Sequence, residues 1–156
     1  MTLDRTDRRI LEQLQADGRL SNQELAERVL LSPSPCLRRV RALERSGVIQ
    51  RYAAMLDPLR VGLELLAYVS VKLEKRGKMP VDQFTRAVQS WPEVITCFSM
   101  TGDMDYLMRV QVEDLAHYSR FIMDKLLKQP GVIDIRSNFV LERVKATSAL
   151  PLEHLA

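Results

Sequence analysis

The sequence predicts an α+β protein, in which a module of short helices precedes a domain of alternating strands and helices. Residues 1–60 show capped amphipathic helix patterns, whereas residues 61–156 show strand patterns separated by two helices. The charges follow the same division. Residues 1–60 hold 11 arginines and 8 acidic residues, and residues 61–156 hold 12 basic and 12 acidic residues. We therefore predict one domain over residues 1–60, ending in a linker strand, and a second over residues 61–156.

The composition is typical of a folded protein, with 46% hydrophobic and 28% charged residues. No apolar run approaches the ~18 residues of a membrane span, and the N-terminus is too charged for a secretory signal. We therefore expect a cytoplasmic protein without a membrane segment. Cys36 and Cys97 stand far apart, which suggests neither a disulfide framework nor a metal site, so no metal or other cofactor is predicted.

Two short helices are predicted before residue 31. The first follows a possible N-cap at Asp4 and ends at Gly18. The second starts at Asn22, because Ser21 and Glu24 have the spacing of a capping box. This helix is short, since a fresh helix start follows within a few residues.

The third helix begins in the stretch L-S-P-S-P-C-L-R-R-V-R-A-L-E-R-S-G. With Ser32 as N-cap, Pro33 and Pro35 occupy first-turn positions, where the backbone N–H groups have no intrahelical partner to lose. One face carries Cys36, Leu37, Val40 and Leu43, and the opposite face carries Ser34, Arg38, Arg41 and Arg45, with Arg39 to the side. The prolines therefore start a helix that exposes arginines, and Gly47 ends it.

The second and third helices form a helix-turn-helix, whose second helix fits the major groove of double-stranded DNA. A solvated charged face is the alternative interpretation of the arginines. The leading end carries Ser32, Ser34 and Pro35, so Ser34 and Arg38 are the candidates for base contact. Arg39, Arg41 and Arg45 are the candidates for phosphate contact. Residues 48–58 are expected to form a short strand pair or wing, and Asp57-Pro58 marks the end of the module.

The predicted order of strands and helices in the second domain is βαββαβ. Strands are predicted at 66–74, 94–100, 107–112 and 133–144, and a charged loop is predicted at 75–78. One helix lies between Pro80 and Pro92, and another follows the cap Asp114. The second helix is expected to bury Leu115, Tyr118, Ile122 and Leu126. W-P-E-V-I and Q-P-G-V-I each close a helix and open a strand, so the domain contains a repeated βαβ unit. This is the ferredoxin-like arrangement, a four-stranded antiparallel sheet with both helices on one face.

The other face of this sheet must also be covered. The first and last strands, at 66–74 and 133–144, are apolar on more than one side. We therefore expect two subunits to pack sheet against sheet as a homodimer.

A turn between the second and third strands, T-G-D-M-D-Y-L, contains Gly102, Asp103, Asp105 and Tyr106. An ordinary glycine-aspartate hairpin turn has the same spacing. Alternatively, carboxylates can accept from the ammonium group of an amino acid, and glycine lets its carboxylate approach backbone N–H groups. One exposed turn cannot bury such a ligand, so a second subunit would have to close the site.

The motifs together resemble the Lrp/AsnC family of feast-or-famine transcription factors over nearly the whole chain. The resemblance rests on five stretches: L-D-R-T-D-R-R-I-L, L-S-P-S-P-C-L-R-R-V-R-A-L-E, G-V-I-Q-R-Y, D-P-L-R-V-G and T-G-D-M-D-Y-L. It implies a winged-type helix-turn-helix joined to a ferredoxin-like effector domain. It also implies dimers that form tetramers, octamers or larger assemblies.

In that family an amino acid effector binds between dimers, near the turn and the last strand. Carried over, the effector residues are Gly102, Asp103, Asp105, Tyr106, Ser137, Asn138 and Phe139. Methionines near the turn could line an apolar pocket, so leucine, methionine or another apolar amino acid is the expected effector.

Two other functions share parts of this pattern. Haem-precursor decarboxylases resemble the same two-part fold. No nucleophile–base pair is visible, however, and His117 and His154 are expected on an exposed helix side and in a loose tail. We therefore predict no catalytic residues. An architectural protein that binds DNA without responding to an amino acid would share every motif, so only ligand binding separates it from the regulator.

Overall fold

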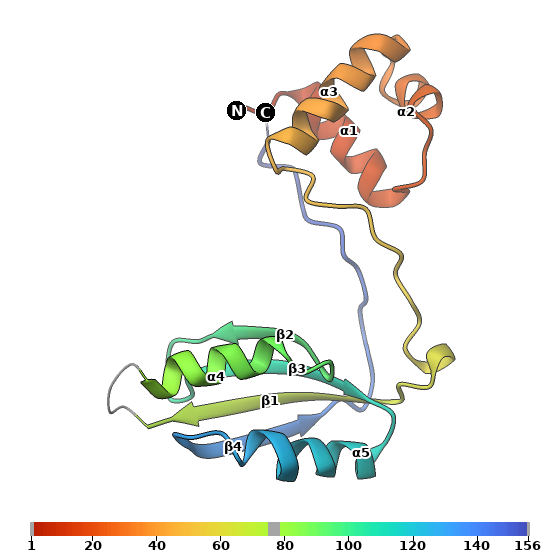
Figure 1. Cartoon of the computed structure of the whole chain (residues 1–156). Coiled ribbons are helices and arrows are strands. Elements are labelled where there is room, and N and C mark those ends of the chain that lie inside the picture. Colours follow the sequence, from red (N-terminus) through yellow and green to blue (C-terminus); the bar gives the residue numbers. More distant parts are fainter. Residues whose placement is uncertain (1, 75–78, 156) are drawn as a thin grey trace. The chain divides into compact units, whose positions relative to one another are not determined.

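A computed structural model describes residues 2–74 and 79–155, so the predicted loop at 75–78 lies outside the described residues (Figure 1). The chain forms two compact units. The helical unit is Met1–Met55 together with Lys145–Ala156, and the sheet unit is Leu56–Val144. Among the described residues, no helix has the length and apolar character needed to cross a bilayer.

The helical unit contains α1 (Arg5–Ala16), α2 (Asn22–Val29) and α3 (Pro33–Arg45). The predicted caps are confirmed. Asp4 and Asp7 form a capping box at α1, and Ser21 and Glu24 form one at α2. Ser32 is the N-cap of α3, although its side chain makes no capping hydrogen bond. Residues 30–32 connect α2 to α3, which is the helix-turn-helix arrangement.

The core of the helical unit includes residues of the C-terminal tail. Leu152 and Leu155 pack against the cluster formed by the three helices, and Gln15 exchanges two hydrogen bonds with the backbone of Leu150. The sequence assigns residues 145–156 to the second domain and expects a loose tail. The contacts place them with the helices instead, because the two leucines find apolar partners there.

The predicted strand pair or wing after Gly47 is not formed by the described chain. Residues 50–57 have no regular secondary structure, and a short 3₁₀ turn follows at Leu59–Val61. A strand needs a hydrogen-bonded partner, and no described segment of the helical unit pairs with residues 50–57.

The sheet unit contains β1 (Leu65–Leu73), α4 (Met79–Gln89), β2 (Val94–Ser99), β3 (Tyr106–Val112), α5 (Leu115–Arg120) and β4 (Val132–Phe139). A π-helical segment, Phe121–Leu126, continues α5. The strand order is β2-β3-β1-β4, and every pair is antiparallel. The predicted ferredoxin-like fold is therefore confirmed.

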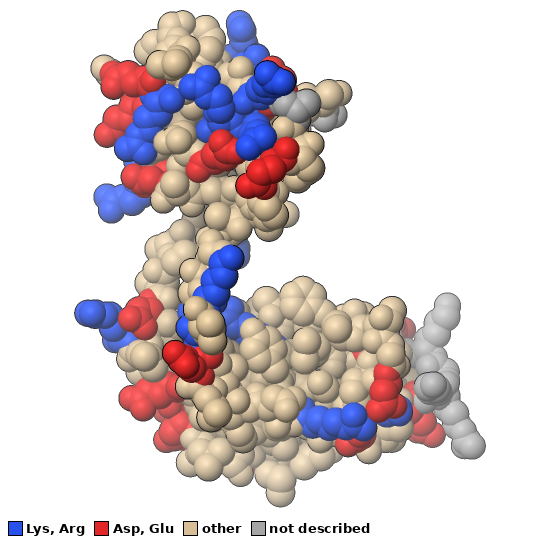
Figure 2. Space-filling model, turned by 180° about the vertical axis from the view of Figure 1, so that it is seen from behind, with Lys and Arg blue, Asp and Glu red and all other residues tan. Residues whose placement is uncertain are grey.

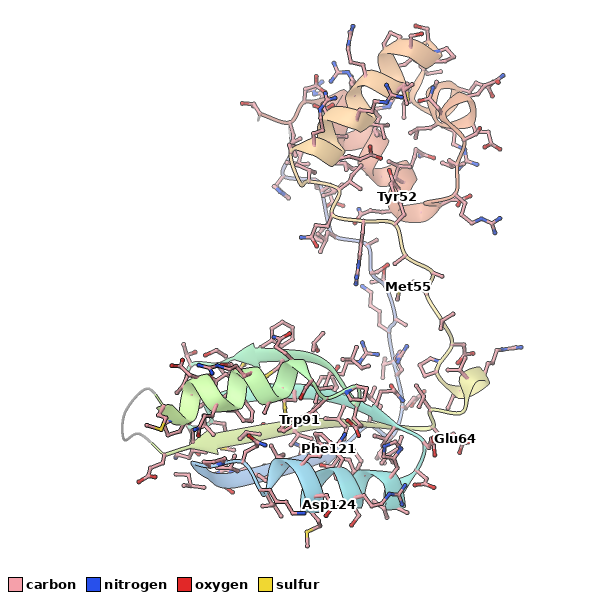
Figure 3. All side chains as sticks on the ribbon, viewed as in Figure 1. Tyr52, Met55, Glu64, Trp91, Phe121 and Asp124 are labelled. Carbon is pink, nitrogen blue, oxygen red and sulfur yellow. The ribbon has the colours of Figure 1, made fainter. Side chains whose placement is uncertain are left out.

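Both helices pack on the same face of the sheet. Ala67, Val69 and Val71 of β1 are fully buried and form one cluster with Phe84 of α4 and Phe121. Trp91 lies edge-on to Phe121, with ring centroids 5.5 Å apart (Figure 3). Because side chains alternate along a strand, the residues between them on β1 belong to the other face, the open face.

Two details of the last elements differ from the prediction. The last strand ends at Phe139 rather than Val144, because its partner β1 begins at Leu65 and pairing stops at the bond from Val140 N–H to the Leu66 carbonyl. Leu115 is 61% exposed, whereas Tyr118 and Leu126 are buried as predicted. The wider π turns bring Phe121 onto the buried side with them.

Candidate DNA-binding and effector surfaces

Four polar residues of α3 and one leucine form a continuous stripe, which we call the arginine surface. Ser34, Leu37, Arg38, Arg41 and Arg45 line a shallow hollow of about 220 Å³. Figure 2 shows basic side chains, with acidic ones among them, over the helical unit seen from behind. Within the described residues, Arg38, Arg41 and Arg45 pair with no carboxylate. Their charges are therefore available to an outside anion.

Arg39 differs from the other arginines of α3. Its Nη1 donates to Asp4 Oδ2 and to Asp7 Oδ1, each at 2.8 Å. These hydrogen bonds raise the pKa of Arg39. Asp4 and Asp7 also cap α1, and the Asp7 side chain is only 5% exposed. Arg39 therefore joins α3 to the start of α1.

The leading end of α3 is held by a residue that sequence reasoning missed. Asn22 Nδ2 donates to the Pro33 carbonyl at 2.9 Å, which ties the start of α2 to the start of α3. Ser32, Ser34 and Pro35 follow at this end, where Ser32 and Ser34 are exposed and Pro35 is half-buried. No local pattern identifies Asn22, because the contact depends on how the two helices cross.

The predicted effector turn, residues 101–105, folds back on the sheet. Gly102 has φ +111°, a conformation that favours glycine. Asp103 pairs with Lys72 at 2.8 Å and with Arg136 at 3.1 Å, and the hydrogen bond from Lys72 lowers the pKa of Asp103. Asp105 Oδ2 accepts from Leu73 N–H at 2.7 Å. Both carboxylates thus already have partners within the chain.

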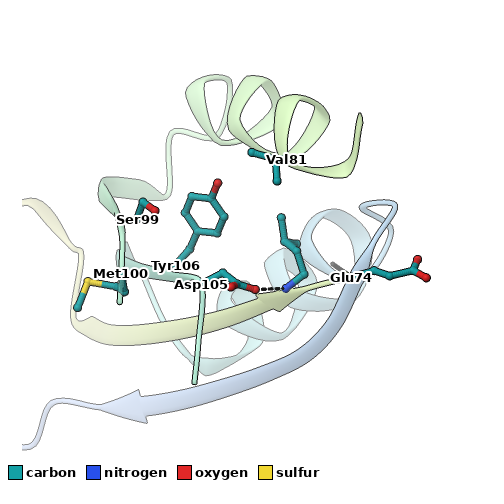
Figure 4. A pocket seen from close by; sticks show the side chains of 7 residues that line it. Glu74, Val81, Ser99, Met100, Asp105 and Tyr106 are labelled. Carbon is teal, nitrogen blue, oxygen red and sulfur yellow. Dashed lines mark hydrogen bonds between the residues drawn. The ribbon is translucent and has the colours of Figure 1, made fainter. Parts of the chain in front are cut away.

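A hollow of about 400 Å³ lies beside this turn (Figure 4). Leu73, Val81 and Met100 supply apolar side chains, and Asp105 and Tyr106 lie on its wall. Tyr106 is 8% exposed and its ring packs at a tilt against that of Phe84, so most of it belongs to the core. The hollow is open, and the described chain alone cannot enclose a ligand there.

Arg136 of β4 reaches the turn through Asp103, but the predicted effector residues of this strand, Ser137, Asn138 and Phe139, form no hydrogen bond or ion pair with the turn among the described residues. Ser137 and Phe139 lie on the helix face, where Tyr118 Oη donates to Ser137 Oγ at 2.5 Å and packs against the Phe139 ring. Asn138 lies on the open face and pairs with Tyr68, whereas the turn bonds to Val71 and Leu73. At about 3.3 Å per residue, the three positions from Tyr68 to Val71 separate Asn138 from the turn by roughly 10 Å along the sheet.

An arginine-bearing helix-turn-helix linked to a ferredoxin-like domain with an open hollow defines a class of ligand-responsive DNA-binding regulators. Comparison with known families agrees. A family described as "Lrp/AsnC ligand binding domain" matches residues 66–150, and one described as "Winged helix-turn-helix DNA-binding" matches residues 3–50.

Known proteins resemble the chain over almost its full length. The leucine-responsive regulatory protein of Escherichia coli is 45% identical over 97% of this chain and 92% of its own. A transcriptional regulator from Neisseria meningitidis, solved in complex with L-Met, is 48% identical with a TM-score of 0.96, and covers 99% of this chain and 100% of its own. An AsnC family regulator from Agrobacterium tumefaciens is 38% identical with a TM-score of 0.92, at the same coverage.

The chain belongs to the Lrp/AsnC family of transcriptional regulators. It carries both the winged helix-turn-helix DNA-binding domain and the ligand-binding domain of that family.

Proposed function

We propose that α3 enters the major groove of double-stranded DNA and that the arginine surface makes the contacts. Ser34 and Arg38, at the leading end with Ser32 and Pro35, approach base edges, and Arg41 and Arg45 neutralise phosphates. The observation that carries this proposal is that Arg38, Arg41 and Arg45 share one surface without a carboxylate partner in the described chain. The internal ion pairs of Arg39 support a positioning role rather than the phosphate contact predicted from sequence.

Two substitutions test the division between base and phosphate contacts. Arg38→Gln should reduce the preference for selected over random duplexes, because a bidentate base contact contributes about 1–3 kcal/mol of discrimination. Arg41→Gln should weaken both duplexes about equally. Fluorescence anisotropy with both duplexes measures the two effects. Equal losses on both duplexes from both substitutions would contradict the assignment.

We further propose that the open face of the sheet forms a homodimer interface. Tyr68 is 40% exposed and Phe98 is 56% exposed on this face. Arg109 lies between them, opposite Tyr68, and its Nε is inaccessible to solvent without any hydrogen-bond partner in the described chain. Exposed aromatic rings and an inaccessible guanidinium Nε–H without a partner are typical of a surface that another protein covers.

Sedimentation velocity tests this interface. Wild type should sediment as a dimer or larger at micromolar concentration, and Phe98→Glu should shift it towards monomer, since a carboxylate would be buried between two sheets. Leu127→Glu is a matched control, because Leu127 is similarly exposed, at 53%, but lies outside the sheet. A monomeric wild type would contradict the proposal.

We propose that the effector is an apolar amino acid bound at the turn of Gly102 and Asp105, in a site that a second subunit completes. The hollow beside the turn has apolar walls from Leu73, Val81 and Met100. Since Ser137, Asn138 and Phe139 do not line the hollow beside the turn, they would contribute through assembly of dimers into tetramers, octamers or larger forms. Relatives described as leucine-responsive or complexed with L-Met support leucine or methionine.

A thermal-unfolding panel against each of the twenty amino acids at millimolar concentration tests the effector. A ligand at a hundredfold excess over Kd stabilises the native state by about 2.7 kcal/mol. We expect a selective upward shift with leucine, methionine or a similar side chain. No shift with any amino acid, while DNA binding persists, would support the architectural alternative.

We propose no enzymatic reaction and no cofactor for this chain, and we expect it in the cytoplasm with its DNA. His117 lies 3.6 Å from Glu93, which is itself bound to Lys125. This arrangement is an ion-pair cluster between α5 and the start of β2 rather than a nucleophile and its base. The described residues contain no group of three or more potential metal ligands.

A further inference from the structure

Leu37 occupies a position that the periodicity of the sequence does not predict. The pattern groups it with the buried residues Cys36, Val40 and Leu43. In the structure Leu37 is 36% exposed and lines the hollow of the arginine surface, with Ser34 and Arg38 beside it. Leu37 and Arg38 each stand three or four positions from both Ser34 and Arg41, and Arg45 follows Arg41 by four, so the five residues form one stripe along the helix. Leu37 therefore lies near the centre of the proposed DNA-reading surface.

The chemistry of the major groove identifies a partner for this side chain. The groove presents hydrogen-bond donors and acceptors from every base pair, but its apolar group is the C5-methyl of thymine. Leu37 carries no donor or acceptor, and its arginine neighbours already supply the polar contacts. When the exposed side chain of Leu37 contacts a thymine methyl group, both apolar surfaces leave water. This burial favours binding.

We infer that Leu37 is a specificity-determining residue that contacts the methyl group of a thymine in the operator. This inference rests on the proposed entry of α3 into the major groove. Leu37 follows Ser34 by about one helical turn and directly precedes Arg38. The α-helix rises about 1.5 Å per residue, so Leu37 and Arg38 are close together along the helix axis. Base pairs are about 3.4 Å apart along the axis. The thymine therefore lies within one or two base pairs of the pair that Arg38 contacts.

Replacement of thymine by deoxyuridine tests the contact, because it removes only the methyl group. Duplexes are first selected from a random pool with the full-length protein, and each thymine of the selected duplex is then replaced in turn. One replacement should weaken wild-type binding about fourfold, the equivalent of about 0.8 kcal/mol for one buried carbon. The Leu37→Ala protein should bind the selected duplex and this deoxyuridine-containing duplex equally. Leu37→Met should retain the difference, since it keeps an apolar side chain of similar volume.

The controls separate this contact from a folding defect. Circular dichroism should show the same helix content for Leu37→Ala and wild type. Leu150→Ala should keep the methyl dependence, since Leu150 is 70% exposed in the same unit but does not line the hollow. A wild type insensitive to every deoxyuridine, or a Leu37→Ala protein that retains the full methyl dependence, would overturn the thymine contact alone. Failure to enrich any duplex would overturn the proposed DNA-reading role as well.

Discussion

The two units differ in whether their candidate functional residues already have partners within the chain. In the helical unit, Arg38, Arg41 and Arg45 face outward without internal carboxylate partners among the described residues. In the sheet unit, Asp103 and Asp105 already bond to side chains or backbone of the same chain. A DNA backbone can bind the first surface directly, whereas a ligand at the second must compete with existing bonds or use groups from another subunit. The proposed DNA contact therefore needs groups of one chain alone, whereas the proposed effector site needs either rearranged bonds or groups from a second subunit.

The largest expected effect tests whether the two units unfold separately. Leu43 and Phe84 are fully buried, one in each unit. Leu43→Ala should lower the free energy of unfolding of the helical unit by about 2–5 kcal/mol, and Phe84→Ala that of the sheet unit by about 3–5 kcal/mol.

Trp91 gives a reporter for this test, because it is the single tryptophan and lies in the core of the sheet unit. Leu43→Ala should shift the thermal transition seen by circular dichroism and leave the Trp91 fluorescence transition in place. Phe84→Ala should shift the fluorescence transition. A single transition that moves equally for both variants would show that the units unfold together.

A smaller effect is expected from the C-terminal tail. Leu152 and Leu155 are partly buried against the helices, so Leu152→Ser with Leu155→Ser should destabilise the helical unit by about 2 kcal/mol. Leu150→Ser is the control, because its side chain is 70% exposed. Circular dichroism on heating measures both. If the double variant unfolds like wild type, the tail does not contribute to the core of the helical unit.

Local signals in the sequence predict most of the helical unit. The capping pairs Asp4–Asp7 and Ser21–Glu24 lie three residues apart, so the positions of α1 and α2 follow from neighbours in the chain. The tail was misassigned because Leu152 lies far along the sequence from the helices that it contacts. Leu37 was misplaced for a related reason: helical spacing defines a face, but the packing of α1 and α2 decides how wide the buried part is.

Alternation and the repeated βαβ unit predict the sheet, but its candidate site was only half predictable. The turn at Gly102 can be predicted from the local sequence, because glycine readily adopts the positive φ found there. Its distance from Asn138 depends on strand register, which adjacent residues in the sequence do not specify. Whether a second subunit brings the turn and Asn138 into one site depends on assembly, which local sequence patterns do not predict.

A third prediction concerns the acid sensitivity of the sheet unit. Burial raises the pKa of Glu93, but the hydrogen bonds and charge of Lys125, at 2.6 and 2.9 Å, together with hydrogen bonds from the backbone and His117, outweigh it and hold that pKa below its ordinary value of 4.5. A depressed folded-state pKa stabilises the protein above the unfolded-state pKa, and this stability is lost as the pH falls through the folded-state value.

Glu93→Gln should therefore destabilise the sheet unit near neutral pH by about 1 kcal/mol, a modest amount because Lys125 is 37% exposed. The difference between variant and wild type should shrink below pH 4.5. Trp91 fluorescence during urea unfolding at several pH values measures it. Asp124→Asn is the matched control, since Asp124 forms an exposed pair with Lys128 and its loss should change stability little at any pH. A pH-independent difference for Glu93→Gln would contradict the charged interaction.

The smallest effect separates Arg39 from Arg41 within the arginine-rich helix. Binding to duplex DNA releases about 0.9 counterions for each phosphate neutralised, so the slope of log K against log salt counts phosphate contacts. Arg41→Gln should make this slope shallower by about 0.9. Arg39→Gln should leave it unchanged but weaken selected duplexes more than random ones, because Arg39 orients α3 through Asp4 and Asp7. Arg39→Lys should restore part of the preference, since lysine can reach one carboxylate but not hold two in a planar fork. A shallower slope for Arg39→Gln would contradict the positioning role and support the phosphate contact that the sequence predicts for Arg39.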